Sequence, residues 1–287
     1  MSETSGSIGA YGAWVGRSEQ SCDTITAGPL DRLAATLDRD TPRVADGDAV
    51  TPLGHWLFFL PDARQSEIGP DGHPKRGGFL PPVNELPRRM WAGSRITFRD
   101  DVHVGDKLSR RSVIRSVKHK DGASGPLVFV TVRHEICRVG QPVSIVDEHD
   151  IVYRGLQAPT AKPSPQMAKI GAWRREFTPD AVQLFRYSAL TFNSHRIHYD
   201  RDYVTRQEGY PGLVVHGPLI ATLLLELIRV NAPHRRVTEF SFRALSPLFD
   251  GDTMSINADP PGADGHIRLW AANAQNNLAM TAEARIA

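Results

Sequence analysis

Two stretches of the chain alternate between hydrophobic and polar positions, which is the period of a β-strand with one buried face. In the first half these segments are 96–104, 107–120, 127–140 and 143–155, with turns at Gly105-Asp106 and Asp121-Gly122. In the second half they are 236–248, 252–260, 266–274 and 278–286, with turns at 260–265 and Asn276-Asn277. Glycine, proline, asparagine and aspartate suit the backbone conformations of turns. Each half therefore predicts an antiparallel meander.

Three other segments have helical spacing. Residues 29–37 combine that spacing with strong helix formers. A second helix is expected to run to about Leu190, with Thr178 as its N-cap and Pro179 at its first position. The third segment, 216–230, is apolar on nearly all faces, so it predicts a buried helix. A curved sheet around such a helix buries both surfaces at once, which predicts an α+β protein with the hot-dog fold.

A weak internal echo indicates that this plan occurs twice. Residues 96–99 (ITFR) precede Gly105-Asp106, and residues 240–243 (FSFR) precede Gly251-Asp252. The sequence therefore predicts a double hot-dog, with two central helices each wrapped by a curved antiparallel sheet. The expected parts are an N-terminal domain over 10–156, a Pro-rich linker over 157–169 and a C-terminal domain over 170–287. A Gly/Pro-dense stretch between 40 and 94 interrupts the first domain, and such segments are usually functional or mobile.

Composition removes several classes of function. The net charge of the 287 residues is +2 and basic residues do not cluster, so no nucleic-acid partner is expected. Cys22 and Cys137 form no disulfide framework or zinc motif, which fits a reducing cytoplasm. The N-terminus lacks the pattern of a signal peptide, and the apolar run 213–230 contains His216, Pro218 and Glu226, so no membrane span is expected. No metal or redox cofactor is implied.

Candidate chemistry is concentrated in residues 185–219, where a polar loop with two histidines leads to the start of the buried helix. The first N–H groups of a helix are unpaired and carry partial positive charge. Gly217 would allow a carbonyl oxygen to approach them and be polarised there. The loop 193–198 offers a base and an amide that can orient water. This combination suits the addition of water to a double bond conjugated to a thioester.

The same segment resembles the signature of the MaoC-like, R-hydratase-type hydratases, an Asp-x-Asn-Pro-x-His-x-Asp loop followed by a His-Gly pair. His198 matches the catalytic histidine, Asp200 the trailing acid, and His216-Gly217 the helix opening. The resemblance implies that His198 activates water and that the Gly217 N–H binds the thioester oxygen. At the position of the family's catalytic aspartate this chain has Asn193, which would orient the water.

Two further departures and a second stretch refine the resemblance. His195 and Arg196 replace the family's asparagine and proline. Residues 188–200 and 209–219, with 79–82 and 86–93, resemble the branch that contains mesaconyl-C4-CoA (3-methylfumaryl-CoA) and itaconyl-CoA hydratases and mitochondrial-type hydroxyacyl-thioester dehydratases. A dicarboxylyl substrate needs an arginine for its free carboxylate, and Arg196, Arg88 and Arg89 are candidates, with Asp200 a further candidate for substrate binding.

The resemblance implies a hydro-lyase that hydrates or dehydrates an acyl-CoA, with CoA as part of the substrate; an acyl-carrier protein is an alternative carrier. One alternative substrate is a longer 3-hydroxyacyl thioester of fatty-acid metabolism, which would need an open apolar tunnel. Another alternative is a non-catalytic acyl-thioester-binding module. A thioesterase is disfavoured because Glu226, the only acid of the buried helix, lies far from its start. Two hot-dog units in one chain satisfy the usual dimer of this fold, and a homo-oligomer is possible.

Overall fold

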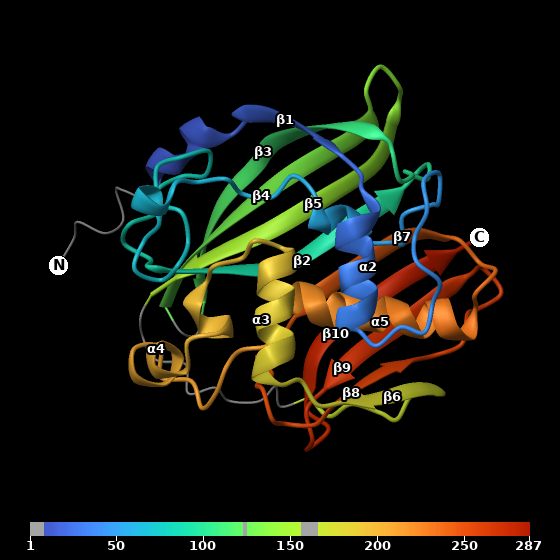
Figure 1. The fold of residues 1–287 in the computed structure, drawn as a ribbon. Helices are drawn as coiled ribbons and strands as arrows, with labels where there is room; N and C mark the ends of the chain where they lie inside the picture. The colour runs from blue at the N-terminus through green and yellow to red at the C-terminus, as the bar shows by residue number, and fades with distance from the viewer. Residues whose placement is uncertain (1–8, 123–124, 156–165) are drawn as a thin grey trace.

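A single antiparallel sheet runs through both halves of the chain (Figure 1). The computed structural model describes residues 9–122, 125–155 and 166–287. The strands of the first half are β1 (Ser18–Thr24), β2 (Arg88–Phe98), β3 (Lys107–Gly122), β4 (Gly125–Arg138) and β5 (Val143–Arg154). Those of the second half are β6 (Trp173–Phe177), β7 (Val237–Ala244), β8 (Met254–Ala258), β9 (His266–Ala272) and β10 (Leu278–Ile286). The strands β3-β4-β5 and β8-β9-β10 form meanders as predicted, whereas β2 and β7, expected as the first strand of each meander, pair instead with β5 and β10.

The order of the strands is symmetric about the middle of the sheet. It reads β1-β3-β4-β5-β2-β7-β10-β9-β8-β6, so each strand of the first half has a counterpart at the mirrored position of the second. The two echoed sequences meet at the centre, where Ile96 of β2 pairs with Phe240 of β7. This is the arrangement expected of a duplicated unit, and the double hot-dog class predicted from the sequence is confirmed. Most of the expected linker, 157–169, lies outside the described residues.

Helix α5 (Gly217–Asn231) is the central helix of the second half, as its apolar pattern predicted. It packs against β6, β8, β9 and β10, and its residues from Leu219 to Ile228 are buried. The other helices are α2 (Ala27–Thr36), α3 (Ala181–Leu190) and α4 (Arg201–Arg206), with short 3-10 turns η1 (Gly9–Trp14), η2 (Gly54–Leu57), η3 (Gln65–Glu67) and η4 (Arg196–His198). The N-cap of α3 is Asp180, which accepts from Gln183 N at 2.7 Å, rather than the expected Thr178.

The first half differs from the expectation of a second central helix. Helix α2 follows β1 as α3 follows β6, and the two helices pack against each other. The counterpart of α5, which would precede β2, is only the single turn η2 in the described residues. Leu53 and Phe59, on either side of that turn, have φ angles of 69° and 55°, a left-handed conformation that a right-handed helix cannot include. The concave face of the first sheet is therefore covered mainly by irregular chain.

Two hydrophobic clusters divide the interior. The larger one surrounds α5 and joins both halves of the sheet. The smaller one lies under β3, β4 and β5, where η1 and the segment 79–86 cover the sheet. No helix among the described residues is long and apolar enough to cross a membrane. Between the two clusters lies the polar region that carries the candidate site.

A buried ion pair fastens the end of α2 to the central helix, and its loss should destabilise the fold. Arg39 Nη2 lies 2.5 Å from Glu226 Oε1, and both side chains are only 7% exposed. Arg39→Met should lower the free energy of unfolding by about 3 kcal/mol, because it leaves a buried carboxylate undercompensated. In urea titrations, the double variant Arg39→Met/Glu226→Leu should recover most of that loss. A double variant no more stable than the single one would contradict this role.

Candidate active site

The polar loop between α3 and α4 begins with a tight turn at the end of α3. Phe192 has a φ of 48°, and the N–H of Asn193 donates to Ser188 O at 2.8 Å. The side-chain oxygen of Asn193 in turn accepts from the N–H of His195 at 3.0 Å. This local turn uses the amide oxygen of Asn193 and leaves its NH₂ group available. The predicted water-orienting residue is therefore fixed by its own loop.

His198 is buried at the end of η4. Its Nδ1 lies 2.7 Å from the carbonyl oxygen of Val214. A carbonyl only accepts, so Nδ1 carries the proton and Nε2 presents a lone pair. Burial lowers the pKa of His198 to about 4, although the bond to Val214 opposes that shift. The side chain is thus a neutral imidazole at neutral pH, the form that can accept a proton from water.

His216 stacks on His198 at the start of α5. The two ring centroids are 3.7 Å apart and the rings are nearly parallel, at 17°. The Nε2 atom of His216 lies 2.9 Å from Ser188 Oγ, while its buried Nδ1 has no hydrogen-bond partner among the described residues. Burial and the neighbouring histidines lower the pKa of His216 well below its usual value. The stack brings His198 to the helix start that contains Gly217.

The N–H of Gly217 has no hydrogen-bond acceptor among the described residues. A Cβ added at this glycine would have only Met280 Cε within 4 Å, at 3.9 Å, so packing alone does not require a glycine here. The position is therefore open on the side where a side chain would stand. A helix start with an unpaired N–H beside a neutral imidazole matches the predicted oxyanion site in position.

Asp200 and Arg196 form part of the frame around the site. Asp200 is the N-cap of α4, where its Oδ1 accepts from Tyr203 N at 3.0 Å. Its Oδ2 pairs with Arg196 at 2.7 Å. Arg196 also donates to Pro70 O and lies over the ring of Tyr203, with Cζ 4.2 Å from the ring centroid. A role for either residue in substrate binding competes with these contacts.

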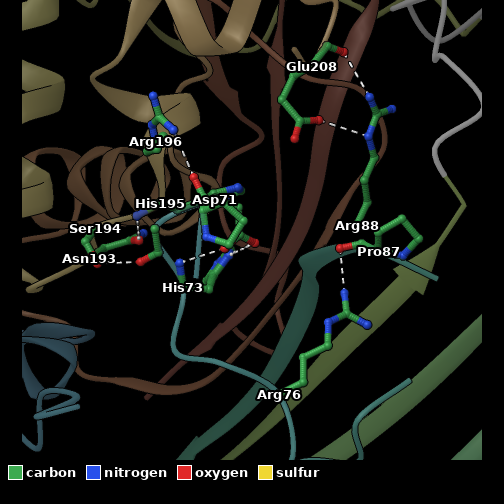
Figure 2. Close-up of polar contacts among 12 residues, drawn as sticks. Asp71, His73, Arg76, Pro87, Arg88, Asn193, Ser194, His195, Arg196 and Glu208 are labelled. Atoms are coloured by element: carbon green, nitrogen blue, oxygen red, sulfur yellow. Dashed lines mark hydrogen bonds and ion pairs between the residues drawn. The ribbon is translucent and has the colours of Figure 1, made fainter. Parts of the chain in front are cut away.

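The Gly/Pro-dense insertion docks directly on the catalytic loop (Figure 2). Ser194 Oγ donates to Gly72 O at 2.5 Å, and Arg196 N donates to Asp71 O at 2.9 Å. Gly72 has a φ of +89°, and a Cβ there would collide with the carbonyl oxygen of Ser194. Only glycine satisfies both constraints. The insertion is thus an ordered wall of the site.

Docking of the insertion gathers a cluster of titratable groups that sequence reasoning missed. His73 Nδ1 lies 3.0 Å from Asp71 Oδ2, and the rings of His73 and His195 have centroids 4.0 Å apart. Burial alone would raise the pKa of Asp71, but its bond with His73 holds it well below the usual range. Burial, followed by the charge of His73, lowers the pKa of His195. The three groups offer ligand atoms within 4.8 Å of one another, so they could hold a metal ion.

Two adjoining cavities border the loop. The larger, about 530 Å³, is lined by Arg89, His73 and His195, and the smaller, about 220 Å³, by Trp91, Asn193 and His216. Arg89 and Trp91 are two residues apart on β2, as are His195 and Asn193 on the loop, so the cavities follow one another along the same boundary. His216, one of the two stacked histidines, lines the smaller cavity.

The predicted arginines of β2 lie at the larger cavity. Arg88 is 9% exposed and its Nε is 2.9 Å from a carboxylate oxygen of Glu208 (Figure 2). Arg89 interacts with the hydroxyl of Tyr153 and bears electrostatically on His73. The structure thus puts Arg89 beside the loop cluster and gives Arg88 an acidic partner of its own.

The far wall of the smaller cavity carries polar residues of the first sheet that the sequence did not single out. They are Arg110 of β3, His134 of β4, and Asp147 and His149 of β5. Asp147 Oδ2 accepts from Trp56 Nε1 at 2.8 Å and is 2.8 Å from His149 Nε2 and 3.2 Å from His55 Nε2. Although burial would raise it, these contacts keep the pKa of Asp147 well below its usual range. In the sequence, the only sign of these residues is a polar side chain at a strand position that the alternation assigns to the apolar face.

Comparison with known proteins places the chain in a family. Residues 52–250 match the family described as hydroxyacyl-thioester dehydratase type 2. Over 252 residues the chain is 47% identical to mesaconyl-C(4)-CoA hydratase of Chloroflexus aurantiacus, and the aligned region covers 87% of this chain and 89% of that protein. It is 27% identical over 278 residues to the mitochondrial hydroxyacyl-thioester dehydratase type 2 of Schizosaccharomyces pombe, and the aligned region covers 86% of this chain and 90% of that protein.

A solved structure supports the same fold. A Mycobacterium tuberculosis protein described as having a double hotdog fold superposes with a TM-score of 0.58 at 15% identity, covering 95% of this chain and 96% of that one. This likeness concerns the fold alone. The family match and the 47% identical relative assign the class: the chain belongs to the hydroxyacyl-thioester dehydratase type 2 family. The branch inferred from the loop and the Pro-rich stretch is therefore confirmed.

Docking of the insertion through Gly72 can be tested by two alanine substitutions. Gly72→Ala should detach the insertion, because its Cβ cannot share space with Ser194 O. Gly77→Ala is the matched control: its φ is +96°, but no atom lies within 4 Å of the added Cβ. Limited proteolysis should cut the Gly72 variant faster within residues 62–87 by about tenfold, since about 1–2 kcal/mol of local stability is lost. Equal cleavage of both variants would contradict the docking.

Proposed function

We propose that the protein is a hydratase that adds water to the double bond of mesaconyl-C4-CoA, a small branched dicarboxylyl thioester. One observation carries the proposal: a neutral, buried imidazole, His198, is stacked against the unpaired start of α5 in a chain 47% identical to a mesaconyl-C(4)-CoA hydratase. The adjoining cavity of about 220 Å³ suits a short acyl group better than a long chain. The acyl-CoA is the substrate, and CoA remains attached to the product as its thioester.

In the proposed reaction His198 is the base. Its Nε2 takes a proton from water while the oxygen bonds to the carbon β to the thioester. The electrons of the double bond move toward the thioester oxygen, which becomes an enolate. His198 then returns the proton to the α carbon, and a 3-hydroxyacyl thioester results. The fixed bond from Nδ1 to Val214 keeps the reactive nitrogen in one tautomer throughout.

The enolate would be stabilised by the N–H of Gly217. This N–H has no described acceptor, and it lies at the positive end of a helix that is almost wholly buried. Donors in a water-poor site that are already oriented stabilise developing charge strongly. In this scheme the Gly217 N–H stabilises the enolate, and His198 transfers the proton.

Asn193 would orient the attacking water through its free NH₂ group or through its oxygen. An amide cannot accept the proton, so the second carboxylate of the usual pair is not needed in this scheme. One base suffices when hydroxyl and proton join the same face of the double bond, because the proton removed from water is the one returned. This requirement makes the hydration a syn addition.

The alternative within the family is dehydration of longer 3-hydroxyacyl thioesters, as the name of the Schizosaccharomyces pombe relative indicates for that protein. It needs an extended apolar tunnel. The cavity at His216 is instead bounded by Arg110, His134 and Asp147. Such polar groups would have to be desolvated against a long alkyl chain, which is unfavourable.

Hydration of three thioesters tests the proposal. Purified protein is incubated with mesaconyl-C4-CoA, itaconyl-CoA and crotonyl-CoA while the enoyl-thioester absorbance and the product masses are followed. We expect fastest turnover of mesaconyl-C4-CoA. His198→Ala should lower kcat by about 10²- to 10⁴-fold, the usual contribution of a general base. His234→Ala, at an exposed histidine, is the control and should behave as wild type.

The other outcomes are distinct. Preference for crotonyl-CoA or longer thioesters would transfer the assignment to the fatty-acyl dehydratases. Binding of all three without turnover would support the non-catalytic module. Full activity of the His198 variant would remove His198 from the mechanism while leaving the substrate assignment intact.

A further inference from the structure

The first sheet contains a row of cationic and hydrogen-bonding side chains that the hydration step does not use. In the register of the sheet, Ser112 of β3 pairs with His134 of β4, and His134 pairs with Asp147 of β5. Arg110 lies two residues before Ser112 on β3 and His149 two residues after Asp147 on β5, so they share the face but stand on opposite sides of this row. This face borders the 220 Å³ cavity opposite Asn193 and His216.

Arg110 is a half-buried cation on which the carboxylates of Glu19, Asp147 and Asp23 act electrostatically, although none of them forms an ion pair with it. Its guanidinium makes no hydrogen bond or ion pair within the described residues, and its Nε is buried and unsatisfied. Cζ lies 4.9 Å from the centroid of the Phe59 ring, which holds the side chain against the cavity wall. Nε is the one guanidinium nitrogen that is both buried and unsatisfied, so the two NH₂ groups are left to donate to an anionic ligand in the cavity that Arg110 lines.

Two histidines extend this site. Their rings are 4.4 Å apart, centroid to centroid, and His149 also stacks on Trp91 at 4.1 Å. His134 Nδ1 is bonded to Ser112 Oγ at 2.9 Å, which fixes its ring. The neighbouring carboxylate, Asp147, does not occupy Arg110: its Oδ2 already faces His55, Trp56 and His149. It orients His149 and leaves the guanidinium to a ligand.

We propose that Arg110, with His134 and His149 beside it, binds the free carboxylate of the acyl group and selects dicarboxylyl thioesters. The inference rests on the proposed function, since the thioester end of the same acyl group would lie at Gly217. The substrate then spans the cavity from the start of α5 to β3, with Phe58, Phe59 and Ile136 providing apolar surface for the methyl branch. Arg110 replaces Arg88, Arg89 and Arg196 as the carboxylate-pairing arginine.

The absence of a long central helix in the first half makes room for this site. At the corresponding place in the second half, α5 fills the concave face of the sheet. In the first half the equivalent chain is the turn η2 and the loop that carries Phe58 and Phe59. The two halves therefore divide the work: one supplies the reacting groups and the other recognises the acyl group.

Binding of two saturated thioesters tests the proposal without depending on turnover. Succinyl-CoA and butyryl-CoA have the same chain length, and only the first has a free carboxylate. By calorimetry, Arg110→Met should weaken binding of succinyl-CoA by about 30- to 100-fold, the value of a hydrogen-bonded charge, and that of butyryl-CoA by less than about threefold. Arg111→Met, at the exposed neighbour on the opposite face of β3, should change neither.

Kinetics then separate this inference from the proposed function. In Arg110→Met, kcat/KM for mesaconyl-C4-CoA should fall about 100-fold relative to crotonyl-CoA, and Arg110→Lys should recover part of the loss. Equal losses for both thioesters in binding and turnover, or no loss for either, would overturn the carboxylate site. If wild type hydrates none of the enoyl thioesters but Arg110→Met still weakens binding of succinyl-CoA and not of butyryl-CoA, the proposed function fails and the carboxylate site stands.

Discussion

The burial of α5 is the constraint on which the rest of the structure depends. This helix is apolar on nearly every face, so the sheet and α3 must surround it, and its N-cap, His216, is buried with it while Gly217 is half-buried. A buried helix start keeps unpaired N–H groups in a poorly solvated place. The same burial removes water from His198 and His216 and holds both imidazoles neutral at neutral pH. The packing that stabilises the fold therefore also sets the environment of the proposed base and of the proposed oxyanion donor.

Duplication gives the protein a second concave sheet, and the two copies have diverged in what they enclose. The second sheet encloses a helix. The first encloses an irregular chain and a row of polar side chains, Arg110, His134 and His149 among them. Left-handed backbone at Leu53 and Phe59 limits the helix to one turn. A ligand with both apolar and anionic parts fits such a cavity better than it fits a filled core.

Local patterns in the sequence predicted the elements and the catalytic loop. The strands of both meanders, the buried helix and the loop around His198 follow from alternation, helical spacing and the His-Gly pair, all of which are short-range signals. Contacts between distant segments were not predictable in this way. Asp71 and His73 lie more than a hundred residues from His195, and nothing in their own spacing indicates that the insertion docks on the loop.

The structure differs from the expectation in the second central helix and in the partners of the candidate arginines, for similar reasons. Helix 29–37 was assigned by its own periodicity, whereas its place beside α3 depends on the order of strands in the whole sheet. Arg196 was chosen because it lies in the polar loop and Arg88 because it lies in the Pro-rich insertion, but Asp200 and Glu208 pair with them. Arg110 lies in the same alternating row as the apolar Leu108 and Ile114, but a single polar residue in such a row does not indicate which segment it faces. Only the register of β3 with β4 places it at the cavity.

The central claim is that one histidine both removes the proton from water and returns it to carbon, because Asn193 cannot act as a second base. Hydration of fumaryl-CoA in D₂O tests this directly, since this substrate lacks the methyl branch and its product has one hydrogen on each new sp³ carbon. The vicinal coupling between those hydrogens, measured by NMR, gives the relative configuration of hydroxyl and deuterium. The account predicts a syn addition, in which the hydroxyl and the deuterium join the same face of the double bond. An anti addition would contradict it, because a second proton donor on the opposite face would then be required.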